Sequence, residues 1–107
     1  MFGRCFFLKK EPVVYFLDAR VVRTDDANVS LYASCWICFR DPDDCLALAE
    51  FYLKDGGYEL KEINIPLREI GRKDYKEGKL LKYHKEALKV GRSVVFHPYK
   101  IFSPSDL

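Results

Sequence analysis

The stretch VSLYASCWICFR, residues 29–40, shows the clearest alternation of side chains in this chain of 107 residues. Successive side chains of a β-strand point to opposite faces, so a period of two predicts a strand with one apolar face. The residues of the apolar face are Val29, Leu31, Ala33, Cys35, Ile37 and Phe39. The residues of the other face are Ser30, Tyr32, Ser34, Trp36, Cys38 and Arg40.

The segment before this strand predicts a second strand and a hairpin. Residues 13–23 are rich in Val, Tyr and Phe, which favour strands. Asp25, Asp26 and Asn28 then form a turn cluster, because Asx side chains bond their own backbone and tolerate the left-handed region. Two strands joined by so short a connection are expected to pair antiparallel.

Residues 41–55 carry the strongest helix signals in the chain. Asp41 is a candidate N-cap, and Pro42 suits the first helical position. Gly56 is the expected left-handed stop. The apolar stripe at helical spacing consists of Cys45, Leu48, Ala49 and Tyr52.

The rest of the chain predicts a strand, a helix and another strand. Residues 58–65 form a strand whose imperfect alternation indicates a bulge or burial at one end only, and Pro66 ends it. A helix is expected over residues 75–90 and a short strand over residues 93–97. Residues 2–8 are a candidate for one more strand.

The expected element order is therefore β-β-α-β-α-β. Helices that follow strands pack against the sheet, and we expect both of them on one face of a mainly antiparallel sheet. The predicted fold class is α+β, a two-layer sandwich that forms a single domain over residues 1–107.

Composition excludes disordered and membrane-spanning proteins. Eight Phe, seven Tyr and one Trp are far more aromatic residues than a disordered chain carries. No uncharged apolar stretch approaches the roughly 18 residues that a membrane span needs. Lys9 and Lys10 follow the apolar N-terminal residues, whereas a secretory signal has its positive residues first. We therefore expect a cytoplasmic location and no membrane contact.

The formal net charge of +2 hides an uneven distribution. Residues 11–67 carry five basic and eleven acidic residues, whereas residues 68–92 carry nine basic and four acidic ones. Such asymmetry is typical of a polyanion-binding face, and equally of an oligomer that pairs an acidic surface with a basic one. A solvated helix face explains the basic row more simply. That row consists of Lys79, Lys82, Lys85 and Lys89.

Two of the four cysteines, Cys35 and Cys38, have CxxC spacing. Three steps along a strand separate their α-carbons by about 10 Å and turn the side chains to opposite faces, whereas a disulfide needs less than about 7 Å. A structural zinc site would require a tight turn in place of the strand. The candidates for its further ligands are Cys5, Cys45, His84 and His97. We predict buried free thiols, with no metal and no cofactor.

His84 is the candidate catalytic residue, since it lies at the centre of the apolar face of the expected second helix. One hypothesis is a core histidine bonded to a carbonyl or hydroxyl group. The other is a pocket histidine whose pKa is lowered by burial and which transfers protons. A base of this kind needs a partner. The candidate partners are Asp18, Tyr15, Tyr32 and His97.

Tyr32 and Trp36 share one face of the strand at residues 29–40, and Arg40 ends their row. An aromatic sheet face rarely stays exposed, so this row is a candidate binding or dimerisation surface. The alternative is that another part of the same chain covers it.

These patterns favour a small non-enzymatic binding module, a homodimer or a binder of a protein or small ligand through the aromatic row. The first alternative is a small enzyme with a helix–sheet pocket around His84, although the chain has no catalytic motif. The second alternative is nucleic-acid binding through the basic row, which the near-neutral overall charge disfavours.

Replacing Lys79, Lys82, Lys85 and Lys89 together by Gln tests the nucleic-acid alternative. Exposed helix charges contribute only about 0.3 to 0.5 kcal/mol per pair, so the variant is expected to fold. We expect no tight complex of the wild type with RNA or DNA at about 150 mM salt in fluorescence anisotropy. A submicromolar complex that the quadruple variant loses would contradict this expectation.

Overall fold

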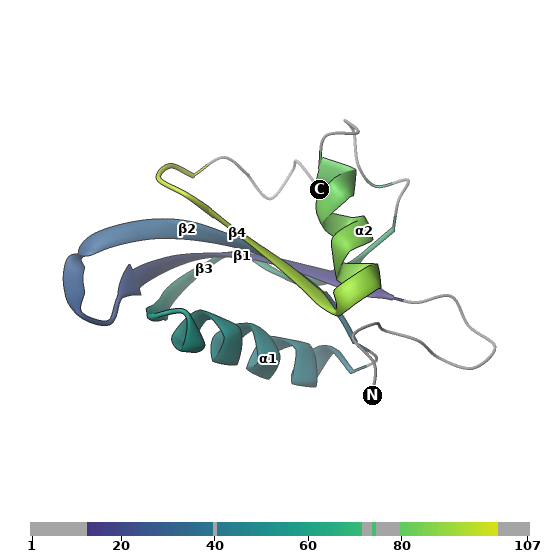
Figure 1. Cartoon of the computed structure of the whole chain (residues 1–107), viewed down its shortest axis with the longest axis horizontal. Coiled ribbons are helices and arrows are strands. Elements are labelled where there is room, and N and C mark those ends of the chain that lie inside the picture. Colours follow the sequence, from purple (N-terminus) through teal and green to yellow (C-terminus); the bar gives the residue numbers. More distant parts are fainter. Residues whose placement is uncertain (1–12, 40, 72–73, 75–79, 101–107) are drawn as a thin grey trace.

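The computed structural model of the chain describes residues 13–39, 41–71, 74 and 80–100. Its four strands form one antiparallel sheet in the order β3-β1-β2-β4, flanked by two helices (Figure 1). The elements are β1 (Val14–Arg23), β2 (Asp26–Cys38), α1 (Pro42–Asp55), β3 (Tyr58–Ile70), α2 (Leu81–Val90) and β4 (Arg92–His97). The predicted α+β class, element order and antiparallel sheet are confirmed. The candidate strand at residues 2–8 and the expected helix start at residues 75–79 lie outside the described residues.

The β1–β2 hairpin is the centre of the sheet. It pairs Val14 with Cys38 at its open end and Arg23 with Asp26 at its turn. The turn is tighter than expected, because the strand already resumes at Asp26, whose carboxylate accepts from the Asn28 amide at 3.0 Å. This local Asx bond gives the turn cluster its predicted role.

The start of α1 is built as its sequence predicts. The Asp41 carboxylate accepts from the Asp43 amide at 2.9 Å, and Pro42 occupies the first turn. At the other end the left-handed residue is Gly57, with φ of 92°, rather than the expected Gly56. The strand that follows begins at Tyr58, as expected.

β3 continues through Pro66 to Ile70, so the expected end at Pro66 is wrong. Proline lacks a backbone donor, but β3 lies at an edge of the sheet, where that donor is not needed. The predicted irregularity is confirmed, since the pairing of β3 with β1 shifts register at three places along the strand.

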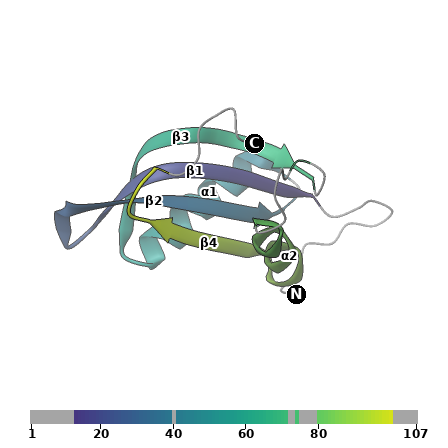
Figure 2. The same ribbon diagram turned by 90° about the horizontal axis from the view of Figure 1, so that it is seen from above.

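The two helices lie on opposite faces of the sheet, so the expected two-layer arrangement with both helices on one face is wrong (Figures 1 and 2). α1 packs its buried Cys45, Ala49 and Leu53 in one cluster with strand residues such as Leu17 and Ile37. α2 covers one end of the other face.

The cluster under α2 explains this arrangement. Ala87 packs there with Phe16, Trp36 and Cys38, which alternate along the strands with the residues that face α1. Both faces of the hairpin are apolar at this end, and an apolar sheet face must be buried against another layer. One helix on each face satisfies that requirement.

Trp36 anchors the cluster under α2. It is 1% exposed, and its ring centroid lies 5.0 Å from those of Phe16 and Tyr83. Replacing Trp36 by Ala is expected to lower the free energy of unfolding by about 3 to 5 kcal/mol in urea denaturation. Phe51 is 61% exposed on α1, so replacing it by Ala is the control, with a change within about 0.5 kcal/mol. Equal losses from the two variants would contradict the core position of Trp36.

Candidate functional site

Each strand of the sheet contributes one side chain to a polar cluster on the α2 face, beyond the part that α2 covers. The Ser34 hydroxyl donates to Asp18 Oδ1 at 2.7 Å. The Asn64 amide donates to Asp18 Oδ2 at 2.7 Å. His97 Nε2 lies 3.2 Å from Ser34 Oγ. Asp18 and Ser34 are both 0% exposed, so the cluster holds a carboxylate inside the fold.

Strand register places these four side chains together. Asp18 on β1 stands directly opposite Ser34 on β2. His97 on β4 is opposite Tyr32, and so reaches Ser34 along the diagonal that long side chains can span. Asn64 is the extra residue of a bulge, because Ile65 pairs with Asp18 while Ile63 already pairs with the next residue. Bulges re-aim side chains in this way.

The hydrogen bonds of the cluster have a fixed direction. An ionised carboxylate only accepts, and a serine hydroxyl has one hydrogen, which Ser34 gives to Asp18. His97 Nε2 must therefore carry the hydrogen that is donated to Ser34 Oγ. Burial lowers the pKa of His97 below 6.5, against a smaller raising effect of the Asp18 charge. His97 is therefore neutral at pH 7, as the Nε2–H tautomer.

This order of groups differs from that of a serine hydrolase. There the histidine stands between the serine and the carboxylate and takes the serine proton. Here Ser34 stands between Asp18 and His97, and it is fully buried. Its oxygen cannot reach a substrate, and its hydrogen points at the carboxylate. The arrangement secures a buried carboxylate rather than activating a nucleophile.

The candidate catalytic residue, His84, is not grouped with all of its candidate partners in the structure. His84 is 4% exposed on the buried side of α2, as expected. Two of its candidate partners, Asp18 and His97, instead meet each other through Ser34. A catalytic role of His84 stays a hypothesis. Ser34 and Asn64 were not among the candidates, and the imperfect alternation of β3 was the only signal for Asn64.

Trp36 cannot belong to the candidate binding surface, because α2 buries it within the monomer, as the alternative interpretation of the row holds. α2 covers it because that end of the sheet face is apolar. Tyr32, further along the same face, is half-buried, and Lys100 Nζ lies 6.0 Å from the centre of its ring. Arg40, the end of the row, lies outside the described residues.

The basic row of α2 is solvated where the structure describes it. Lys82, Lys85 and Lys89 are exposed, whereas Lys79 lies outside the described residues. Lys82 Nζ lies 5.0 Å from the ring centre of the neighbouring Tyr83. Exposed lysines are required both by a solvated helix face and by a phosphate-binding face, so their exposure fits either interpretation of the row.

Cys35 and Cys38 belong to the two different cores, so the predicted strand geometry of the CxxC pair is confirmed. Both are buried free thiols, as is Cys45, while Cys5 lies outside the described residues. Burial, together with the Asp18 charge, raises the pKa of Cys35 to about 12, which makes this thiol unreactive. Within the described part of the chain, no group of three or more His, Cys, Asp or Glu side chains could hold a metal ion. Metal content in solution stays a prediction.

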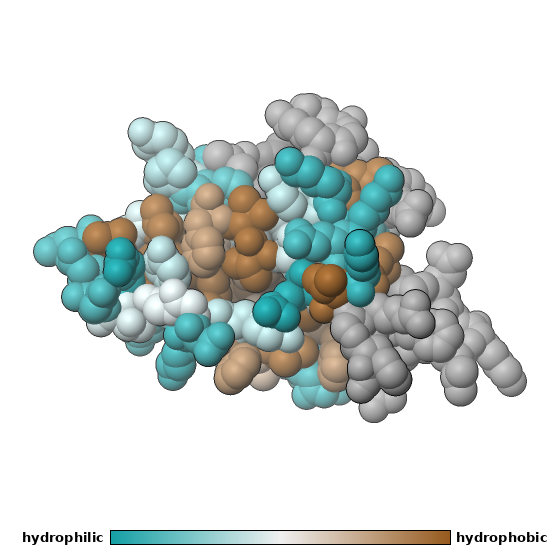
Figure 3. Space-filling model, viewed as in Figure 1, coloured by the Kyte–Doolittle hydropathy of each residue, from teal (hydrophilic) through white to brown (hydrophobic). Residues whose placement is uncertain are grey.

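An apolar surface runs along β4 at the edge of the sheet (Figure 3). The ring of Phe96 is stacked on Tyr58 with centroids 4.6 Å apart, and it remains 39% exposed. The Arg92 guanidinium lies over the ring of Tyr52 at 4.4 Å. We call this the β4 surface. It consists of Tyr52, Tyr58, Arg92, Val94 and Phe96.

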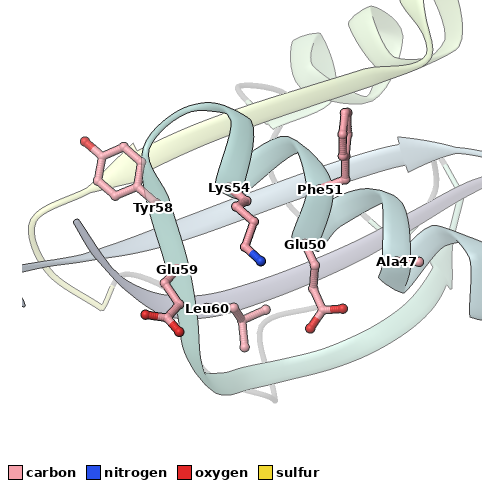
Figure 4. Close-up of a pocket in the computed structure, with 7 residues that line it drawn as sticks. All are labelled: Ala47, Glu50, Phe51, Lys54, Tyr58, Glu59 and Leu60. Carbon is pink, nitrogen blue, oxygen red and sulfur yellow. The ribbon is translucent and has the colours of Figure 1, made fainter. Parts of the chain in front are cut away.

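A cleft of about 400 Å³ lies between α1 and the start of β3 (Figure 4). Glu50, Lys54 and Glu59 line it, and all three are exposed. Phe51 and Tyr58 point away from these charges, toward the side on which β4 passes. The cleft therefore holds no desolvated group that would select a ligand, whereas its aromatic neighbours extend the β4 surface.

Replacing Ser34 by Ala tests the polar cluster. The change leaves Asp18 Oδ1 without its hydroxyl donor in a fully buried position, and we expect a loss of about 1 to 3 kcal/mol in the free energy of unfolding. Ser30 on the same strand is exposed, so replacing it by Ala is the matched control, with a change within about 0.5 kcal/mol. Urea denaturation measures both, and a neutral Ser34→Ala variant would contradict the cluster.

Comparisons with models of protein families, with curated proteins and with solved structures each found no match to this chain. Neither described helix is long and apolar enough to cross a bilayer. The chemistry of the chain's own residues is therefore what indicates its function.

Proposed function

We propose that this protein is a non-enzymatic binding module that takes up an extended strand from a partner along the outer edge of β4, where no other described strand pairs. The observation that carries the proposal is the contrast between the two edges of the sheet. An edge strand presents unpaired amide and carbonyl groups and is a template for another strand, unless the sequence protects it.

The β3 edge has three common forms of protection: register shifts, a proline and exposed charges. Its pairing with β1 shifts register at three places, and Pro66 interrupts its row of donors. Its side chains include Glu59, Lys61 and Glu62, which are exposed and charged. A strand cannot pair along such an edge without losing bonds and desolvating charges.

The β4 edge lacks that protection. Among the described strands, β4 pairs with β2 alone and without a register shift. Its central residues are Val94, Val95 and Phe96, with no charge among them. In strand addition the main-chain bonds provide affinity and alternate side chains provide specificity. Phe96 and Val94 supply the apolar contacts on the α1 side.

The two alternative functions have less support. The enzyme hypothesis needs an accessible pocket around His84, but this side chain is only 4% exposed. Two of its candidate partners, Asp18 and His97, are instead joined through the buried Ser34. Nucleic-acid binding would also need aromatic side chains of the sheet, such as Tyr32 and Trp36, on which bases could stack. A base cannot stack on a tryptophan that is 1% exposed.

An octapeptide of alternating Thr and Val with a Lys at each end is a suitable probe for strand addition. We expect it to shift the backbone amide signals of Arg92, Val94 and Phe96 in NMR titrations, because these are the β4 residues on the open edge. Replacing the exposed Phe96 by Ser removes an aromatic contact and should weaken peptide binding about tenfold.

Leu46 provides the control for that variant, since it is a large apolar residue with the same exposed fraction, 39%, but stands on α1. Its replacement by Ser should leave peptide affinity within about twofold. Peptide-induced shifts that avoid β4, or an equal effect of the two variants, would refute the strand-addition proposal.

A further inference from the structure

We propose that the strand taken up by β4 is the β4 strand of a second copy of this chain, in a twofold dimer centred on Val94. This inference rests on the proposed function and names its partner. Three features of β4 support it: the direction of its backbone groups, the register that these groups allow, and the chemistry at its two ends.

The direction of the backbone groups follows from one hydrogen bond. The Cys38 amide donates to the Gly91 carbonyl at 2.9 Å, immediately before the first residue of β4. Bonded and non-bonded pairs alternate along an antiparallel ladder. Ser93, Val95 and His97 therefore direct their amides and carbonyls to β2. Arg92, Val94 and Phe96 direct theirs to the open edge.

Only one register satisfies all of these open groups. A twofold axis through Val94 pairs it with Val94 of the second copy, and pairs Arg92 with Phe96 of the second copy at both ends. A shift that keeps the side chains on their faces moves the pairing by two residues. In one direction Arg92 then meets Pro98, which has no donor, and in the other Phe96 meets Val90 at the end of α2.

The side chains at the two ends of β4 are complementary to each other. Arg92, Val94 and Phe96 occupy alternate positions and so share one face. An antiparallel copy brings the Arg92 guanidinium to the exposed side of the Phe96 ring, a favourable cation–π arrangement. Arg92 already lies over Tyr52 and Phe96 already stacks on Tyr58. Both groups are thus held in place before the second copy arrives, which reduces the entropy lost on binding.

The same pairing limits the assembly to two copies. The dimer would have a continuous sheet of eight strands, with a β3 strand at each outer edge. The register shifts, Pro66 and the charges of β3 block further strand addition there. An isologous contact of this kind gives a closed dimer rather than a filament.

Disulfide trapping tests the register directly. In a Cys5→Ser background, Val94→Cys should form an intermolecular disulfide under mild oxidation, because directly opposite α-carbons lie about 5.5 Å apart. Val95→Cys is the matched control, because in this register the two copies of residue 95 are not opposite each other. We expect at least a tenfold faster cross-link at position 94 than at position 95.

A charge exchange tests the end contacts. Phe96→Arg places a second guanidinium opposite Arg92, and should raise the dimer dissociation constant at least tenfold by light scattering and sedimentation. Adding Arg92→Phe to that variant restores one cation and one ring at each end, so the dimer should return. A double variant that remains as weak as the single one would overturn the register.

The remaining outcomes separate this inference from the proposed function. Dimerisation with faster cross-linking at position 95 would overturn the Val94-centred register. A wild type that is monomeric up to about millimolar concentration, yet still binds the octapeptide along β4, would overturn the dimer alone. A monomer whose β4 amides also ignore the octapeptide would overturn both.

Discussion

The fold depends on one constraint, which is that both faces of the β1–β2 hairpin are apolar at the same end. Leu17 and Ile37 face α1, while Phe16 and Trp36 face α2. A sheet with two apolar faces needs a layer on each side, and here each face receives one helix. The longer α1 spans its face, and the shorter α2 covers only the end where Trp36 lies. The polar cluster lies on the rest of that face, beyond α2.

The polar cluster makes the sheet specific for one strand register, which its apolar residues alone would not do. Valines and leucines tolerate a shifted register as long as they remain buried. The Asp18 carboxylate is bonded only when Ser34 stands opposite it and Asn64 occupies the bulge of β3. A shift by two residues in either neighbour would leave a buried charge without donors, at a large cost in free energy. The four strands are thereby held in a single register.

The sequence was sufficient for the local features of this fold and insufficient for those that depend on tertiary arrangement. Alternation identified β2, and Asp41 with Pro42 identified the start of α1. Helical spacing showed which side of α2 is buried, but contains no information on which sheet face covers it. From the sequence alone Pro66 predicts the end of a strand, because the edge position that tolerates a proline is known only from strand order. The hydrogen bond of Ser34 could not be predicted from the sequence, because its partner depends on the hairpin register.

The turn at Gly91 determines both where α2 ends and which residues of β4 direct their backbone groups to β2. Gly91 ends the helix with a φ of 100°, and its carbonyl accepts a hydrogen bond from the Cys38 amide of β2. Removing or inserting one residue here would exchange the inner and outer sides of β4, because both backbone groups and side chains alternate with a period of two. Phe96 would then turn from the α1 side to the α2 side, and His97 away from Ser34. Length changes at this turn are therefore expected to be tolerated only in pairs, a restriction that exposed loops elsewhere do not share.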